Sequence, residues 1–598
     1  MELLTLDGVA EKGVFEIPSY QRGYAWQKRQ LKDFWNDLEH VSKLGNKFHY
    51  MHSLTLRGLE NELEDSAFEI IDGQQRLATS LILLDLLAKI TQHKDPKYYS
   101  MNLEPILSYK YYGLSEAFRA IMEEEKDLEA FKTSFYAKNL IKAYEFFQEK
   151  ISDTPVGTLE KMFDALIKKM LFSVVGLNDN RIDPFSSFET INNRGKDLST
   201  LELLKNRLHF VVHKICDEED LENLQQEIND TYTRIYHDLR FFKDDHLESF
   251  LKHFVAYYYG ENSKFKERLL NTAFDAHKKY DDLYDEYEKI NDLLLHLSYS
   301  SKVWYFLHTL DDEELRIEIT PKMRGLLDKM RRLNALSENA FLPLLLSLLT
   351  IQLAVRSGSE RHYTTKELEG LLEYLERFGF LIYGVAGSKN TAKKEWIGLA
   401  FKAIQACRFW EDKITIEDLP TLEKSFFNRQ GNSALELLEE SIHSKKNTEK
   451  WYQWGKALNY LLYEYELHHN PETTLNFDSS LESIEHILPQ KPDQGYSAKE
   501  KSWAKNPHIV HALGNLLLIA KNANSSLSNK PFDEKRKQYL KGSYSEKEVA
   551  KNASFGVAQI KERSEKLLDF LISRYRIAKL VGENAIKAFK NALLKEIK

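Results

Sequence analysis

The sequence predicts a multidomain α+β protein that is mostly helical. Its 598 residues are too many for one hydrophobic core, which favours two to four domains. Only 25 glycines and 13 prolines occur, so long helical segments meet few residues that would break them. Short strand patterns appear in the first 215 residues and again in the last quarter of the chain.

Three regions follow from these patterns. Residues 1–215 mix strands with helices, residues 216–429 are almost entirely helical in pattern, and residues 430–598 form a smaller mixed domain. In the first region, strands are expected at 48–57, 68–71 and 171–177, and an amphipathic helix at 27–41. In the last region, a helix is expected through 451–468 and short strands near 484 and 516.

The composition is that of an ordinary globular protein, with 42% hydrophobic and 29% charged residues. A net charge of −8 excludes a global nucleic-acid footprint, so contact with DNA would depend on local basic patches. The two cysteines, Cys216 and Cys407, match no disulfide or metal framework and suit a cytoplasmic location. The N-terminus lacks a signal peptide, and the apolar run 340–355 is too short to span a bilayer. That run predicts a buried helix, and no membrane partner is expected.

The segment FEIIDGQQRLATSLILLDLL joins a strand to an apolar helix through a polar turn of Asp72, Gly73, Gln74, Gln75 and Arg76. Glycine permits a tight turn, and the first turn of the helix presents N–H groups suited to phosphate. Arg76 adds a forked phosphate donor, and Asp72 would bind a metal ion, orient water or accept from a base or sugar. The alternative is structural: Asp72 caps the helix and Arg76 makes a salt bridge.

Two further polar turns resemble this one in composition. FEIPSYQRGYAW supplies Tyr20, Gln21 and Arg22 just before a helix, and FETINNRGKDLSTLELLKN supplies Asn192 and Arg194. In the latter, Ser199 or Thr200 would cap the next helix with Glu202 as the capping-box partner. The three turns are expected to converge on one phosphate-bearing ligand. A surface loop or an aromatic core explains each turn taken alone.

The C-terminal region carries a second constellation, SIEHILPQ followed by HALGNLLLIAKNANSSLSNK. Hydrolysis of a phosphodiester at neutral pH needs a base to activate water and a cation to hold the phosphate. His486 is the natural base because imidazole titrates near neutral pH. Glu485 lies beside it in a strand and therefore points to the opposite face. Asn515 and Asn524 follow, and the alternative is a core histidine with asparagines that only form turns.

The three N-terminal motifs resemble the N-terminal domain of the GmrSD family of modification-dependent (type IV) restriction enzymes. The resemblance implies a ParB/sulfiredoxin-like fold that binds and hydrolyses a nucleoside triphosphate, GTP or ATP, with Asp72 in a catalytic role. The matching positions are Asp72, Gly73, Gln74, Gln75, Arg76, Tyr20, Gln21, Arg22, Asn192 and Arg194. The G-x-x-x-x-G-K-[ST] motif is absent from the sequence, so the chain is not a P-loop NTPase.

The C-terminal order of an acid and a histidine, then Asn-Leu, then a further asparagine resembles the HNH (ββα-metal) nuclease finger and the C-terminal domain of GmrSD-type proteins. The resemblance implies that His486 is the general base and that Glu485 and Asn524 bind one Mg²⁺ or Mn²⁺. Asn515 would hold the loop that positions His486. Asn522 or Asn529 could replace Asn524, and glutamate stands at position 485 where many HNH enzymes have aspartate.

A basic stretch lies beside this proposed site. Residues 521–541 hold six basic and two acidic side chains, and Lys530, Lys535 and Arg536 are expected to bind DNA phosphates. A solvated helix face explains the same charges equally well.

Together these features predict a nucleotide-dependent enzyme that cleaves double-stranded DNA carrying modified bases, such as hydroxymethylated or glucosylated cytosine in phage DNA. A homodimer is a further expectation. One alternative is a nicking endonuclease of the same architecture that senses phosphorothioate. Another is a nucleotide-dependent regulatory DNA-binding protein with an inert HNH domain, and a weaker one is a toxin or partner-controlled subunit.

Overall fold

A computed structural model of the chain divides it into two compact units, Met1–Phe306 and Leu307–Lys598. The structure describes residues 2–18, 21, 23–45, 47–59, 67–91, 106–110, 113–176, 199–216, 218–261, 263–275, 283–313, 315–355, 359, 362–409, 411–473, 482–492 and 494–598. Within them the protein is mostly helical, with a mixed sheet in the first unit, as the sequence predicts. The boundaries at residues 215 and 429 stay predictions.

The first unit contains one six-stranded mixed sheet in the order β1-β6-β3-β4-β2-β5. Strand β4 pairs antiparallel with β3 and parallel with β2, which in turn pairs parallel with β5. The strands predicted at 48–57, 68–71 and 171–177 are confirmed as β3, β4 and β6. The six strands are β1 (Glu2–Thr5), β2 (Val14–Ile17), β3 (His49–Leu59), β4 (Ala67–Asp72), β5 (Leu107–Tyr109) and β6 (Met170–Gly176).

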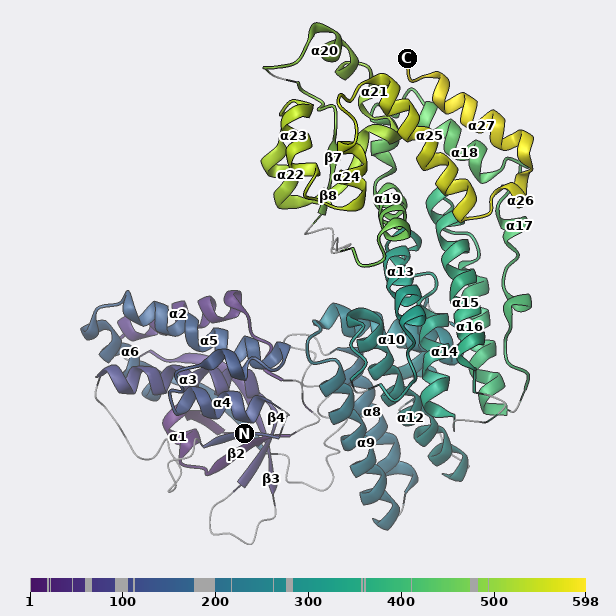
Figure 1. Ribbon diagram of the computed structural model, residues 1–598. Coiled ribbons are helices and arrows are strands. Elements are labelled where there is room, and N and C mark those ends of the chain that lie inside the picture. The colour runs from purple at the N-terminus through teal and green to yellow at the C-terminus, as the bar shows by residue number, and fades with distance from the viewer. Residues whose placement is uncertain are drawn as a thin grey trace. The chain divides into compact units, whose positions relative to one another are not determined.

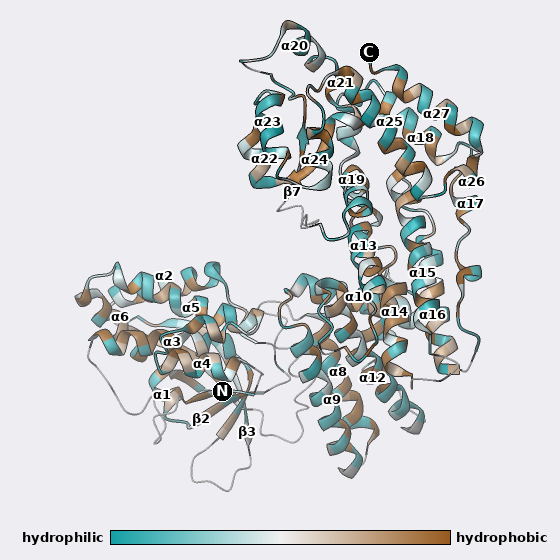
Figure 2. Cartoon of the chain, viewed as in Figure 1, coloured by the Kyte–Doolittle hydropathy of each residue, from teal (hydrophilic) through white to brown (hydrophobic). Residues whose placement is uncertain are grey.

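Helices α2, α3, α5 and α6 pack against one another beside this sheet (Figure 1). The helix predicted at 27–41 is α2, whose apolar residues face inward. Helix α3 is buried at every position from 77 to 88, so it forms a rigid support for the turn before it, and its apolar residues colour that ribbon brown in Figure 2. The helices here are α1 (Leu6–Ala10), α2 (Lys28–Lys43), α3 (Gln74–Thr91), α4 (Leu114–Met122), α5 (Phe135–Ser152) and α6 (Val156–Lys168).

From Ser199 onward, the described residues of the first unit are mostly helical. Ser199 caps α8 as predicted: Ser199 Oγ accepts from Glu202 N at 3.3 Å, and Ser199 N donates to Glu202 Oε2 at 2.7 Å. The helices are α8 (Thr200–Ile215), α9 (Glu218–Asp238), α10 (Asp244–Tyr259), α11 (Phe265–Glu267) and α12 (Leu283–Thr309), the last of which continues into the second unit.

The second unit begins with long helices. The apolar run 340–355 is the buried helix α14, as predicted. Among the described residues, none of the helices has the length and apolar character needed to cross a bilayer. The α-helices from Pro321 to His469 are α13 (Pro321–Ser337), α14 (Leu342–Ala354), α15 (Thr365–Phe378), α16 (Lys393–Phe409), α17 (Leu422–Ser425), α18 (Ala434–His443) and α19 (Lys456–His469).

The single helix predicted through 451–468 is wrong in its first part. A 3-10 turn at Lys450–Trp454 precedes α19, and the two are separated by Gly455 at φ +60°. This backbone conformation favours glycine and interrupts the helix.

The two strands predicted near 484 and 516 are confirmed as an antiparallel pair, β7 (Glu482–His486) and β8 (Leu516–Ala520). Helix α22 (Lys521–Leu527) follows β8 directly and contacts both strands, which gives a strand-strand-helix unit. The remaining helices are α20 (Ala498–Ala504), α21 (Pro507–Val510), α23 (Phe532–Tyr539), α24 (Tyr544–Ala550), α25 (Val557–Arg574), α26 (Ala578–Val581) and α27 (Glu583–Lys595).

Candidate functional site

The polar turn after β4 depends on Gly73. Its φ is +101°, and a Cβ atom there would lie 2.9 Å from Ser53 O and from a methyl carbon of Leu54. Only glycine fits so close to β3 in this conformation. The first intrahelical bond runs from Leu77 N to Gly73 O at 3.1 Å, so the amides of residues 74–76 begin α3 at the turn.

Asp72 and Arg76 lie on the solvent-facing side of this turn, each with a side chain that is 20% exposed. Asp72 Oδ2 accepts from Ser53 Oγ and from Arg76 Nη2, both at 3.1 Å. Arg76 Nη2 also donates to Ser53 O at 2.9 Å. The structural alternative considered for this pair, a salt bridge, is therefore present, and it holds both side chains at the mouth of the helix.

Two glutamines tie the chain at Gln21, Gly23 and Ala25 to strand β4 and the turn after it. Gln75 Oε1 accepts from Ala25 N at 2.8 Å, and Gln75 Nε2 donates to Gly23 O at 3.1 Å. Gln21 Nε2 donates to the carbonyl oxygens of Ile70 and Ile71, the latter at 2.8 Å. Two of the three predicted turns are thus brought together. In this conformation the amide groups of Gln21 and Gln75 serve to join the motifs.

Gln74 differs from these two side chains. It is 7% exposed, and its Oε1 has no hydrogen-bond partner among the described residues. A buried amide oxygen of this kind is costly unless a ligand or water donates to it. This acceptor, the amides of α3 and Arg76 therefore fit a phosphate-bearing ligand with its own donors. Four predicted positions, Tyr20, Arg22, Asn192 and Arg194, lie outside the described residues.

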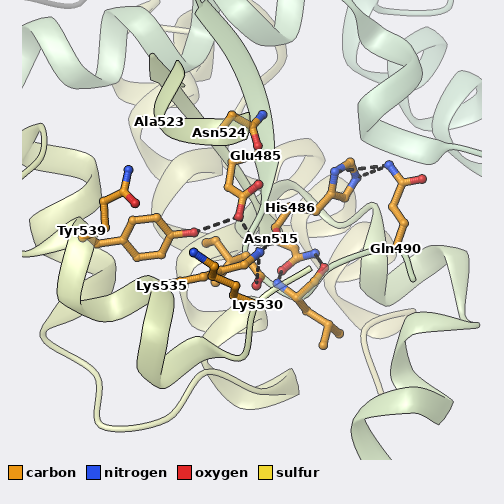
Figure 3. A network of polar contacts seen from close by, with 12 residues as sticks. Glu485, His486, Gln490, Asn515, Ala523, Asn524, Lys530, Lys535 and Tyr539 are labelled. Atoms are coloured by element: carbon orange, nitrogen blue, oxygen red, sulfur yellow. Dashed lines mark hydrogen bonds and ion pairs between the residues drawn. The ribbon is translucent and has the colours of Figure 1, made fainter. Parts of the chain in front are cut away.

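In the second unit, the alternation of β7 sends Glu485 and His486 to opposite sides of the strand, as predicted (Figure 3). The His486 ring is 7% exposed, and its Nε2 lies 3.0 Å from Nδ1 of His511. The Tyr452 ring centroid is 4.9 Å from that of His486, and Gln490 Nε2 lies 3.3 Å from His486 Nδ1. His486 is therefore held by three side chains.

Burial, reinforced by His511 and then Lys535, lowers the pKa of His486 to about 3, so the ring is neutral at pH 7. Burial also lowers the pKa of His511. Between two neutral imidazoles one nitrogen donates and the other accepts, which fixes the tautomer of each relative to the other. The sequence alone predicts no role for His511. Its only signal is its place at the start of the HALGN segment.

The side chain of Asn515 hydrogen-bonds to the backbone of two segments. It is 0% exposed, and its Nδ2 donates to Leu488 O at 2.9 Å and to Val510 O at 2.7 Å. Its Oδ1 accepts from Leu488 N at 2.8 Å. The amide thus holds the chain directly after His486.

Replacing Asn515 by alanine should destabilise this segment, because three buried hydrogen bonds are lost and three backbone groups are left unpaired. We expect the local free energy of unfolding to fall by about 3 kcal/mol or more. Hydrogen exchange of β7 and β8 in the full chain measures it. Asn522→Ala is the matched control, since Asn522 is exposed and its Oδ1 accepts only locally, from Ala523 N. Equal protection in the two variants would contradict the role of Asn515.

Glu485 is paired within the protein. Its Oε1 accepts from Lys535 Nζ at 2.5 Å and from Tyr539 Oη at 3.1 Å. Burial raises the pKa of Glu485 and the nearby ammonium opposes that shift. Glu485 is 4% exposed and Lys535 is 0% exposed, so the ion pair is closed to solvent.

The side-chain amide of Asn524 hydrogen-bonds to strand β7. Its Nδ2 donates to Ser483 Oγ at 2.7 Å and to Ile484 O at 3.2 Å. Among the described residues, no group of three or more His, Cys, Asp or Glu side chains could hold a metal ion. The predicted ligand pair, Glu485 and Asn524, therefore does not fit a divalent ion in this structure, because the carboxylate is already neutralised by an ammonium group.

The predicted DNA-binding side chains separate into two kinds. Lys530 is exposed, and Arg536 is half-buried with its Nε donating to Ala550 O at 2.8 Å. Lys535 cannot contact a phosphate because its side chain is fully buried. Its place in a basic stretch suggested exposure, but it lies on the inner side of α23 together with Tyr539, four residues further on.

Two models of known protein families match the parts of the chain that contain these two sites. Residues 5–209 match the GmrSD restriction endonuclease, N-terminal domain, and residues 438–570 match the GmrSD restriction endonucleases, C-terminal domain. The two matches together cover more than half of the chain, and they contain the β4–α3 turn and the strand-strand-helix unit, respectively. A comparison with curated proteins finds no match. The chain belongs to the GmrSD restriction endonuclease family.

Proposed function

We propose that this chain is a nucleotide-controlled, modification-dependent (type IV) restriction endonuclease that cleaves foreign DNA carrying modified cytosines. The observation that carries the proposal is the position of His486. His486 ends β7, where its imidazole would accept a proton from water that attacks a phosphodiester once bound DNA displaces Gln490 or His511 from the ring nitrogens. Without DNA the ring is a weak base, because burial lowers its pKa to about 3. Asn515 holds the segment after it, and His511 and Gln490 contact its ring nitrogens. ParB/sulfiredoxin-like and HNH folds for the two matched domains belong to the same proposal.

The N-terminal turn supports the nucleotide part of this proposal. A nucleoside triphosphate would place its phosphates against the first turn of α3 and Arg76, where helix amides and a guanidinium favour negative charge. Gln74 Oε1 would accept from a ligand hydroxyl or amine. Asp72, held by Ser53 and Arg76, is the side chain proposed to act in hydrolysis. The second unit would then cleave DNA only when nucleotide is bound to the first unit.

The experiment is a cleavage panel in Mg²⁺ buffer. Unmodified, hydroxymethylcytosine, glucosylated and phosphorothioate DNA are each incubated with the full chain and GTP, ATP, CTP, UTP or no nucleotide. We expect cleavage of cytosine-modified DNA that depends on GTP or ATP. Cleavage of phosphorothioate DNA alone would identify that DNA, and not cytosine-modified DNA, as the substrate. Equal cleavage of unmodified DNA without nucleotide would exclude control by nucleotide.

A second candidate is a nucleotide-dependent regulatory DNA-binding protein with an inert nuclease domain. The observation that favours it is the closed ion pair of Glu485 with Lys535, at a position where the family resemblance implies a metal ligand. Plasmid nicking measured over a titration of Mg²⁺ and Mn²⁺ separates the two candidates. An absence of nicking on every DNA substrate and at every metal concentration would favour the regulatory protein.

A further inference from the structure

The ammonium group of Lys535 has the surroundings of a bound cation. Three oxygen atoms accept from its Nζ: Glu485 Oε1 at 2.5 Å, His486 O at 2.9 Å and Ile487 O at 3.3 Å. Tyr539, four residues along α23, donates its hydroxyl to the same carboxylate oxygen (Figure 3). Helix α23 is thus fastened to the end of β7 at the position of His486.

The charges in this cluster balance without an external ion. A buried carboxylate requires a partner of opposite charge, and the ammonium supplies one positive charge at contact distance. A divalent cation on the same carboxylate oxygen would lie against that ammonium, and the two positive charges would repel each other in a site closed to water. The Glu485–Lys535 pair therefore has balanced charges without a divalent cation.

We propose that Lys535 is the fixed cation of the nuclease site. Its ammonium takes the place of a divalent ion at Glu485 and, through the carbonyl oxygens of His486 and Ile487, positions the strand end that carries the imidazole. Glu485 is accordingly a partner of Lys535 and does not bind metal. The relevance of this positioning to catalysis rests on the proposed nuclease function, but the cation assignment does not.

The first test measures Mn²⁺ affinity of the full chain by electron paramagnetic resonance. Glu485→Gln should bind Mn²⁺ within about twofold of the unchanged protein, since its carboxylate holds no divalent ion. An absence of detectable Mn²⁺ binding in both proteins supports the same assignment. A loss of affinity of about tenfold or more in Glu485→Gln would overturn it, because the carboxylate would then be a metal ligand.

The second test removes the ammonium. Lys535→Met leaves the buried Glu485 carboxylate with the Tyr539 hydroxyl but without a cation, so we expect a lower Tm and a gain in Mn²⁺ affinity relative to Lys535→Met/Glu485→Gln. The double variant should recover most of the Tm, because both charges are absent. Lys537→Met, exposed on the same helix, is the matched control and should change neither quantity.

A merely structural lysine would lower the Tm without any gain of Mn²⁺ binding, and that result would overturn the proposal. Should Lys535→Met fail to fold, the comparison of Glu485→Gln with the unchanged protein still decides the assignment. Neither readout uses DNA cleavage. An inactive nuclease domain and a wrong cation assignment are therefore distinguishable.

Discussion

Replacing His486 by alanine is expected to lower the rate of DNA cleavage by a factor of about 100 to 10,000, the range that a general base contributes. The ring of His486 contacts His511, and burial lowers its pKa to about 3, so it is neutral at pH 7. Its loss removes the proton acceptor and leaves Asn515 and the strand pair in place. Nucleotide turnover should stay unchanged, since Asp72 and Arg76 belong to the other compact unit.

The measurement is single-turnover cleavage of the DNA that the substrate panel identifies, with nucleotide turnover followed in the same preparation. His443→Ala is the matched control, because His443 ends α18, is half-buried and lies 3.9 Å from Glu439 of the same helix. It should retain full cleavage. Cleavage by His486→Ala at the rate of the control would show that another group activates the water, and the nuclease assignment of this strand would be wrong.

The pattern of the sequence was sufficient to predict long or strongly alternating elements. Helix α2 buries its apolar residues at helical spacing, and β3, β4 and β6 carry β-branched and apolar residues over several positions. Strands β1 and β5 were missed because neither contains a run of isoleucine or valine such as Ile70 and Ile71 in β4. Each gains its place by pairing with a neighbouring strand, which is a tertiary effect.

The candidate sites show the same limit. The residue types in the DGQQR turn and around His486 predicted which segments matter, because their chemistry is local. Hydrogen-bond partners are set by packing: Gln75 bonds residues about fifty positions away, and Lys535 lies fifty positions from Glu485. A lysine in a basic stretch is usually solvated, so the charge of the stretch did not distinguish Lys535 from its exposed neighbour Lys537. Its spacing of four from Tyr539 was the one signal of an inward face.

Replacing Asp72 by alanine is expected to lower nucleotide turnover by a factor of at least about 100, the lower range for loss of a group that acts on the attacking water. Asp72→Asn should be nearly as inactive, although its amide oxygen still accepts from Ser53 and Arg76, because the negative charge is absent. Asp33→Ala, exposed on α2, is the matched control and should retain turnover.

The same variant tests whether the two units are coupled. If bound nucleotide controls cleavage, DNA cleavage by Asp72→Ala should no longer respond to GTP or ATP, although His486 is unchanged. In contrast, His486→Ala should lose DNA cleavage and keep nucleotide turnover. An effect of Asp72→Ala on cleavage requires a coupling free energy between the two sites, and for rates this coupling need not act equally in both directions. Hydrolysis and DNA cleavage are measured on one preparation of each variant. Nucleotide-responsive cleavage by Asp72→Ala at the rate of the Asp33→Ala control would separate the nuclease from this turn, because the carboxylate would then contribute nothing that the second unit detects.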